Sequence, residues 1–380
     1  MSSLARLLHR KFFTSSPATI PSTATTFKTT VDGLFHERDL KKLVEKFKSC
    51  SDNYRFRCKH RIYETTVRRL AGAKKFSWVE EILEHQKKYA DISKEGFAVR
   101  LISLYGQSGM SEHACRMFDQ LPELKCTRTV KSFNALLSAC ADSRNFDKVD
   151  QIFRELPSRL SITPDLFSYN IMVRALCDRG SLDSALSFLD EMEKNGVSPN
   201  LITFNTLLNA FYGDNRFSDG EEIWARMEKS NCIPDVQSFN AKMRGLVLLG
   251  KTSEAVKLFD ELKTRGVKPD IFSFNALIKG FCNEGNLEEA KKIYSELEKN
   301  DCTPNRPTYE TLVPCLCEKE DFGLAFKLCK ESLNRCRVDA GLLQVVVDGL
   351  VKESKVEDAK KLVELGRSKS YSRSSLKMPV

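Results

Sequence analysis

The sequence predicts an all-α solenoid, which is a stack of similar helical hairpins with no single central core. An aromatic–asparagine pair recurs five times, and the successive asparagines are 36, 35, 35 and 35 residues apart. A period of this length indicates repeated supersecondary units. Apolar residues follow each pair at helical spacing, as Leu207, Leu208 and Phe211 do. Each unit then closes on a proline, which cannot continue a helix. Together these features predict repeated helix–turn–helix units.

We number every unit so that its recurring asparagine stands at position 5. Nine units then begin at residues 60, 95, 130, 166, 201, 236, 271, 306 and 340. Position 3 is Ser or Thr in six successive units, from Ser132 to Thr308. We expect this hydroxyl to cap the first backbone N–H groups of the first helix. The outer units depart from Asn at position 5, as expected of units that close a stack; they carry Glu64, Val99, Glu310 and Gln344.

The second half of each unit alternates small and large residues in a way that favours close stacking. Position 24 is large in most units, as at Trp224 and Phe259. Position 20 is small in most units, and a small residue lets one helix approach the next closely. The small residues are Ala114, Ala185, Gly220, Ala255, Ala290, Ala325 and Ala359.

The ends of the chain differ from the repeats. Residues 1–30 contain no Asp or Glu and twelve Ser or Thr, with Arg6 and Arg10 beside an apolar helical face. This composition predicts a mitochondrial transit peptide. We predict a basic helical lead-in segment over residues 31–59, the solenoid over 60–367, and a basic, serine-rich disordered tail over 368–380.

Composition and motifs argue against an enzyme or a membrane protein. The chain is 41% hydrophobic and 29% charged, as in soluble folded proteins, and no apolar run approaches the length of a membrane span. The thirteen cysteines include no CxxC pair, and Cys177, Cys282 and Cys317 share one repeat position. We therefore predict packing thiols and no metal site. The sequence also lacks a phosphate-binding loop and a zinc-deaminase signature, so we predict no catalytic residues, cofactor or small-molecule substrate.

The repeats resemble the pentatricopeptide repeat family. The run Ser168-Tyr169-Asn170-Ile171-Met172-Val173, leading to Gly196-Val197-Ser198-Pro199-Asn200, is similar to its motif. The resemblance is strong over 130–305 and weaker over 60–129 and 306–367. The tetratricopeptide repeat, a protein-binding scaffold, has a similar period but lacks the systematic asparagine and the terminal Pro-Asp or Pro-Asn. The resemblance implies a right-handed α-solenoid of the P type, found in plant mitochondria.

The resemblance also implies that each unit reads one base of single-stranded RNA, through position 5 and the last residue of the unit. In the family, Asn with Asp favours uracil and Asn with Asn favours cytosine, so the implied target is U-C-U-U-C. Position 2 sandwiches the base, and Phe167, Ile202 and Phe272 suit that role. The alternative is that the asparagine side chains bond only to neighbouring backbone. The implied pairs are Asn134 with Asp165, Asn170 with Asn200, Asn205 with Asp235, Asn240 with Asp270, and Asn275 with Asn305.

The positive charge lies mainly outside these repeats. Residues 130–305 contain 22 Lys and Arg against 26 Asp and Glu, for a net charge of −4. Residues 38–75 contain thirteen basic residues against four acidic ones, for a net charge of +9. We predict that this basic segment anchors phosphates; a solvated helix face is the alternative. The predicted phosphate-binding residues are Arg55, Arg57, Lys59, Arg61, Arg68, Arg69, Lys74 and Lys75, together with Arg174, Arg244 and Lys279 in the repeats.

Three functions remain open from the sequence. The leading hypothesis is an RNA-binding protein of the mitochondrial matrix that belongs to, or associates with, the small subunit of the mitochondrial ribosome, with ribosomal RNA and ribosomal proteins as partners. The second is a free factor that binds a pyrimidine-rich site on one transcript and guides its stability, processing or translation. The third is a protein-binding helical scaffold.

Overall fold

A computed structural model describes residues 31–336, 338–369 and 375–378; these fall into two compact units, which divide between Pro164 and Asp165. The predicted transit peptide, residues 1–30, lies outside the described residues. Among the residues that are described, no helix is both long enough and apolar enough to span a membrane.

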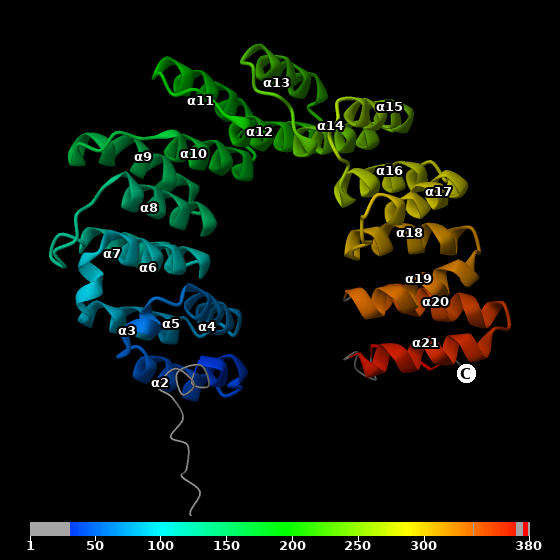
Figure 1. The fold of residues 1–380 in the computed structure, drawn as a ribbon, viewed down its shortest axis with the longest axis horizontal. Helices are drawn as coiled ribbons and strands as arrows, with labels where there is room; N and C mark the ends of the chain where they lie inside the picture. Colours follow the sequence, from blue (N-terminus) through cyan, green and yellow to red (C-terminus); the bar gives the residue numbers. More distant parts are fainter. Residues whose placement is uncertain (1–30, 337, 370–374, 379–380) are drawn as a thin grey trace, which may run out of the picture. The chain divides into compact units, whose positions relative to one another are not determined.

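The first unit begins with a helical turn at residues 31–36 and continues as a chain of short helices (Figure 1). In this unit α6 packs against α4, α7 and α8. Its elements are α2 (Leu40–Cys50), α3 (Tyr54–Arg57), α4 (His60–Gly72), α5 (Phe76–Glu84), the 3-10 turns η1 (His85–Lys88) and η2 (Ala90–Ser93), α6 (Glu95–Gln107), α7 (Ser111–Asp119), α8 (Val130–Asp142) and α9 (Phe146–Leu160).

The second unit contains six helical hairpins in sequence order, which confirms the predicted α-solenoid (Figure 1). Each first helix packs against the first helix of the next hairpin, so that α10, α12, α14, α16, α18 and α20 form one row. The helices are α10 (Leu166–Arg179), α11 (Leu182–Lys194), α12 (Leu201–Gly213), α13 (Phe217–Lys229), α14 (Val236–Leu248), α15 (Thr252–Thr264), α16 (Ile271–Asn283), α17 (Leu287–Lys299), α18 (Arg306–Glu318), α19 (Phe322–Arg335), α20 (Ala340–Lys352) and α21 (Val356–Ser368).

Aromatic contacts join one hairpin to the next. The large residue at position 24 meets the aromatic residue at position 4 of the following unit, edge to face. The ring centroids are 5.3 Å apart for Trp224 and Phe239, and 5.2 Å apart for Phe259 and Phe274. All four rings are buried. The small residue at position 20 is likewise buried, and at Gly220 an added methyl group would lie 2.5 Å from the ring of Tyr212.

Part of the predicted disordered tail is packed. Leu376 is fully buried, and its carbonyl accepts a hydrogen bond of 2.8 Å from the Nη2 atom of Arg367 on α21. The backbone N–H of Lys377 donates to the side chain of Gln344 on α20. The composition of the tail is polar, but the burial of Leu376 removes apolar surface from water and, with these two hydrogen bonds, holds residues 375–378 against the last hairpin.

Gly106 and Gly96, both on α6, offer a matched test of this packing. A methyl group on Gly106 would lie 2.3 Å from the Cα atom of Ala139 on α8, whereas one on Gly96 would have no neighbour within 4 Å. We expect Gly106→Ala to lower the free energy of unfolding by about 1–3 kcal/mol through overpacking. Gly96→Ala should raise it by up to about 1 kcal/mol, because alanine favours the helix. Urea unfolding measures both, and equal stabilities would contradict the close approach of α6 and α8.

Candidate nucleic-acid interface

The last residue of each repeat is the N-cap of the following helix. Asp165, Asn200, Asp235, Asp270 and Asn305 cap α10, α12, α14, α16 and α18, and each forms a capping box with the Ser or Thr at position 3. In one example, the Ser238 backbone N–H donates to Asp235 Oδ1 at 3.0 Å, and the Asp235 N–H donates to Ser238 Oγ at 3.2 Å. The prediction that the position-3 hydroxyl is the cap itself is therefore wrong. A Ser or Thr at the third helical position lies inside the helix and completes the box from there.

The asparagine at position 5 bonds to this capping box of the next repeat. Its Nδ2 atom donates to the Oδ1 atom of the capping residue, and its own Oδ1 atom accepts from the position-3 hydroxyl. For Asn205 these distances are 3.0 Å to Asp235 and 2.5 Å to Ser238. We call the resulting set the amide ladder, and its four rungs are Asn170 to Asn200 and Thr203, Asn205 to Asp235 and Ser238, Asn240 to Asp270 and Ser273, and Asn275 to Asn305 and Thr308.

The amide ladder leaves part of each polar pair free. Asn205 and Asn240 are only 6% exposed, whereas Asn170 and Asn275 are half-buried. In each of the four rungs, one N–H of the asparagine has no partner within the described part of the chain. In its contacts with other described residues, the side chain of the capping residue uses only Oδ1, so Asp235 and Asp270 keep a free carboxylate oxygen there, and Asn200 and Asn305 keep a free NH2 group.

The fifth predicted pair divides between the two units of the chain. Asn134 lies half-buried on α8 in the first unit. Asp165 caps α10 in the second unit, with its Oδ1 accepting from the Ser168 N–H at 3.0 Å. In the first unit, the contact with the capping residue Thr129 comes from position 1 of the preceding repeat and not from an asparagine at position 5. Glu95 accepts hydrogen bonds from both the N–H and the hydroxyl of Thr129.

The three predicted base-sandwiching residues are exposed. Phe167, Ile202 and Phe272 are 67%, 59% and 59% exposed, one residue before the buried position-3 hydroxyl of each unit. Large apolar side chains so exposed, and repeated at one register, are available to stack on a ligand. The structure thus places an apolar side chain and a polar pair together at the start of these first helices.

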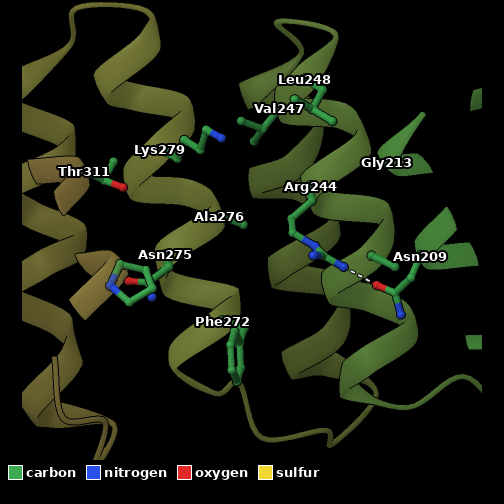
Figure 2. A pocket seen from close by; sticks show the side chains of 12 residues that line it. Asn209, Gly213, Arg244, Val247, Leu248, Phe272, Asn275, Ala276, Lys279 and Thr311 are labelled. Carbon is green, nitrogen blue, oxygen red and sulfur yellow. Dashed lines mark hydrogen bonds between the residues drawn. The ribbon is translucent and has the colours of Figure 1, made fainter. Parts of the chain in front are cut away.

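A hollow of about 400 Å³ lies along the row of first helices beside Phe272 and Asn275 (Figure 2). Its floor is apolar, with Ala241, Val247 and Leu248 among the lining residues. Two of the predicted phosphate-binding residues also line it. Lys279 is exposed, whereas Arg244 donates to the Oδ1 atom of Asn209 and to the carbonyl of Asn240. Lys279 is therefore the freer cation of the two.

The basic segment divides into exposed and internally bonded residues. Arg55, Lys59, Arg61 and Arg68 are exposed, and none pairs with an acidic side chain among the described residues. Lys74 and Lys75 are also exposed. Arg61 and Arg68 lie two turns apart on α4 and so share one face. We call Arg55, Lys59, Arg61 and Arg68 the exposed basic set.

Two predicted phosphate ligands, Arg57 and Arg69, have structural partners. The Nη atoms of Arg69 donate to the carbonyls of Leu34 and Glu37. Arg57 donates from Nε to Asp91 at 2.7 Å and from Nη1 to the carbonyls of Ser51 and Asp52. The prediction for these two residues is therefore corrected, since sequence spacing does not reveal which arginine of a basic run turns inward.

The ion pair of Arg57 and Asp91 is nearly buried, with the side chains 12% and 11% exposed. Burial by itself raises the pKa of Asp91, but the hydrogen bonds from Arg57 and Lys94 outweigh it, and the pKa lies below its usual value. The guanidinium group of Arg57 also lies 4.3 Å from the ring centroid of Tyr89. The first unit therefore depends on an arginine that a count of positive charges assigns to ligand binding.

The cysteines that share one repeat position, Cys177, Cys282 and Cys317, are partly buried, as packing residues are, whereas Cys58 is exposed. Burial raises the pKa of Cys177 to about 12 and that of Cys317 to about 11, so these thiols stay protonated at neutral pH. Within the described ranges, no cluster of three His, Cys, Asp or Glu side chains is placed to hold a metal ion.

Sequence reasoning missed the second role of the position-3 hydroxyls. Thr203, Ser238, Ser273 and Thr308 are fully buried, and each bonds to the asparagine of the preceding repeat. The spacing of 33 residues between each asparagine and this hydroxyl repeats from unit to unit, and it is the signal that could have revealed this contact. A register that repeats across units indicates either a cap or an inter-repeat bond, and only the packing distinguishes the two.

Known proteins support the repeat assignment. Residues 128–178, 164–213, 200–248, 234–283 and 269–318 match the PPR repeat family, and residues 99–143 match the pentatricopeptide repeat domain. In Arabidopsis thaliana, the small ribosomal subunit protein mS79 is 47% identical over 208 residues, 52% of this chain and 53% of that protein. The small ribosomal subunit protein mS78 is 48% identical over 211 residues, with the same coverage.

The chain spans about half the length of these curated relatives. Further relatives in the same plant carry the word mitochondrial in their names. Among solved structures, the pentatricopeptide repeat protein PPR10 from maize aligns with a TM-score of 0.50 at 18% identity, covering 91% of this chain and 59% of that one. At this identity the likeness concerns the fold.

Arg57 and Arg55, both on α3, test the division of the basic segment. We expect Arg57→Gln to lower the free energy of unfolding by about 3 kcal/mol, because it removes the nearly buried partner of Asp91 and leaves only Lys94, whose side chain is 64% exposed. Arg55→Gln should change it by less than about 0.5 kcal/mol. The pKa of Asp91 is lower in the folded state than in the unfolded state, where it is about 4. Its ionised carboxylate therefore stabilises the folded state above about pH 4, and this stabilisation is lost as the pH falls through the pKa of the folded state.

The stability difference between the original protein and Arg57→Gln should therefore be largest at neutral pH and shrink below about pH 4. Urea unfolding at several pH values measures it. A difference that does not vary with pH would show that the carboxylate of Asp91 is not the group that Arg57 stabilises.

Proposed function

Because the chain belongs to the pentatricopeptide repeat family, we propose that it binds single-stranded RNA along the amide ladder without acting as an enzyme. The observation that carries this proposal is the repeated presentation, in four successive rungs, of one free amide N–H beside a capping residue with a free polar atom. An exposed apolar side chain lies within three of the capping boxes, at the second helical residue. A row with one polar pair and one stacking surface per unit suits a ligand with one base per unit.

The free atoms of the capping residue provide a physical basis for distinguishing uracil from cytosine. Uracil has an N–H donor at N3, whereas the N3 atom of cytosine is an acceptor. The free carboxylate oxygen of Asp235 or Asp270 can accept from uracil, and the free NH2 group of Asn200 or Asn305 can donate to cytosine. The free N–H at position 5 can donate to the carbonyl oxygen that both pyrimidines carry beside N3. The four rungs therefore support C-U-U-C, which is the last four bases of the proposed target U-C-U-U-C.

Phosphate binding by the repeats is expected to be weak. Residues 130–305 carry a net charge of −4, and much of nucleic-acid affinity comes from neutralising phosphates. Arg174, Arg244 and Lys279 provide a few cations beside the base-reading positions. The exposed basic set, on and around α3 and α4, is the better candidate for an anchor because its side chains are free of acidic partners among the described residues.

We further propose that the protein works in the mitochondrial matrix as a component of the small ribosomal subunit, or bound to it. Relatives that are named as small ribosomal subunit proteins, mS79 and mS78 among them, share nearly half of their residues with this chain over the aligned part. The composition of residues 1–30 and the relatives named as mitochondrial support that compartment. A repeat array with weak phosphate binding and a separate basic anchor suits docking on a large structured RNA better than independent capture of one transcript.

The exposed basic set predicts a change in salt dependence. Changing Arg55, Lys59, Arg61 and Arg68 together to Gln should weaken RNA binding and reduce the slope of log affinity against log salt by about 2–3, at about 0.7 per lost phosphate contact on a single strand. Fluorescence anisotropy across a series of salt concentrations measures the slope.

The matched control changes four exposed lysines on second helices to Gln, namely Lys194, Lys229, Lys257 and Lys299. It alters the net charge by the same amount, so its slope should stay near that of the original protein. Equal slopes for both variants would show that the basic segment is a solvated face and does not anchor phosphates.

Sedimentation and crosslinking test the ribosomal role. In a gradient of mitochondrial lysate, we expect the protein to migrate with the small ribosomal subunit, and ultraviolet crosslinking should recover ribosomal RNA. Migration wholly apart from the subunit, with crosslinks to one messenger site, would favour a free transcript factor. The absence of any crosslinked RNA would favour a protein-binding scaffold.

A further inference from the structure

The buried hydroxyl at position 3 has a role that extends to the preceding repeat. Thr203, Ser238, Ser273 and Thr308 are each fully buried. Their hydroxyl oxygens lie 2.6, 2.5, 2.6 and 2.7 Å from the Oδ1 atom of the asparagine one repeat earlier. No other polar contact of these asparagines recurs at so short a distance in the described residues. The inference that follows rests on the proposed base-reading function of the amide ladder.

An amide presents different chemistry at its two ends. A rotation of 180° about the last side-chain bond exchanges the acceptor Oδ1 with the donor Nδ2. In the observed orientation, the hydroxyl donates to Oδ1 and the capping residue accepts from Nδ2, so the second N–H is left for a base. In the rotated orientation, Oδ1 would face the oxygen of the capping residue, and two acceptors would oppose each other.

The hydroxyl is itself held in place. It accepts the backbone N–H of the capping residue, at 3.1 Å for Thr308 and Asn305 and 3.2 Å for Ser238 and Asp235. Its single proton has two acceptors within reach: the Oδ1 atom of the preceding asparagine at 2.5–2.7 Å and the Oδ1 atom of the capping residue at 3.0–3.2 Å. The contact with the asparagine is the shorter one, and the capping oxygen already accepts the position-3 backbone N–H. The capping box thus fixes the hydroxyl, and the hydroxyl fixes the amide.

We propose that the Ser or Thr at position 3 of one repeat is a positioning residue for the base read by the preceding repeat. The selectivity of each unit then depends on its C-terminal neighbour as well as on its own polar pair. This dependence ends after Asn275, because the unit that begins at residue 340 has Leu342 at position 3.

The dependence differs between the two kinds of rung. Where the capping residue is Asp235, its full negative charge holds the Nδ2 atom of Asn205 even without the hydroxyl. Where the capping residue is Asn305, only a neutral amide oxygen faces Asn275. Hydrogen bonds to a charged acceptor are about twice as strong as those to a neutral one. Loss of the hydroxyl should therefore affect an Asn–Asn rung more than an Asn–Asp rung.

Thr308→Val and Ser238→Ala test this difference. Thr308→Val removes the hydroxyl beside the Asn275–Asn305 pair and keeps the volume of threonine. Ser238→Ala removes the hydroxyl beside the Asn205–Asp235 pair. The probes are RNA oligonucleotides that carry U-C-U-U-C within oligoadenylate, with the fifth base C or U and the third base U or C. Anisotropy gives the ratio of affinities for each pair of probes.

We expect Thr308→Val to reduce the preference for C over U at the fifth base by about tenfold, equivalent to one missing hydrogen bond of about 1.4 kcal/mol. Ser238→Ala should change the preference for U over C at the third base by less than about threefold, and Thr308→Ser should restore the fifth-base preference. Thermal unfolding of each variant shows whether it is folded, and a purely structural role of the hydroxyl would lower affinity for all probes equally.

The outcomes separate the two levels of the proposal. If the original protein binds all probes equally, the base-reading function and this inference are both overturned. If the original protein discriminates and Thr308→Val discriminates equally well, only the positioning role of the hydroxyl is overturned. A loss of fifth-base preference that Thr308→Ser restores would support it.

Discussion

The joint between consecutive repeats depends on one small hydrogen-bonded group: a capping Asp or Asn, the Ser or Thr three residues later, and the asparagine of the preceding repeat. The group satisfies the first N–H groups of a helix, which would otherwise be left without partners. It also ties that helix to the one before it, because the asparagine bonds to both the cap and the hydroxyl. A cap of this kind typically contributes about 1 kcal/mol, and the second unit repeats it at five helix starts.

The same group explains how a fold-stabilising contact can also present polar atoms to a ligand. A carboxylate has two oxygens and an amide has two N–H groups, and the joint uses only one of each. Folding therefore fixes the orientation of the pair, and the unused atoms keep a constant chemistry from repeat to repeat. A ligand meets a polar pair that is already ordered, which lowers the entropic cost of binding. This arrangement also means that changes to the pair affect both stability and recognition.

Electrostatics divides the chain between two kinds of contact. In the repeats, acidic residues slightly outnumber basic ones, so recognition there depends on hydrogen bonds and stacking. Near the N-terminus the charge is strongly positive, but part of it is internal, since Arg57 and Arg69 hold the first unit together. The charges that remain for phosphates are the exposed ones, and their number is smaller than the net charge of the segment suggests.

The sequence by itself determined the helical repeats, their register and the rows in which residues recur. The 35-residue period and the helical spacing can be read along the chain because they do not depend on how the units stack. It also placed Asn205 at position 5 and Asp235 at the last position of one unit. Tertiary structure alone decided which atoms of that pair are used, because Asn205 meets Ser238 across 33 residues and only packing brings the two helices together. Tertiary structure also decided that Arg57 turns toward Asp91 while Arg55 stays exposed, and that Leu376 is buried in a tail of polar composition. The direction of a side chain depends on its neighbours in space, and the charge pattern along the chain does not reveal which residues those neighbours are.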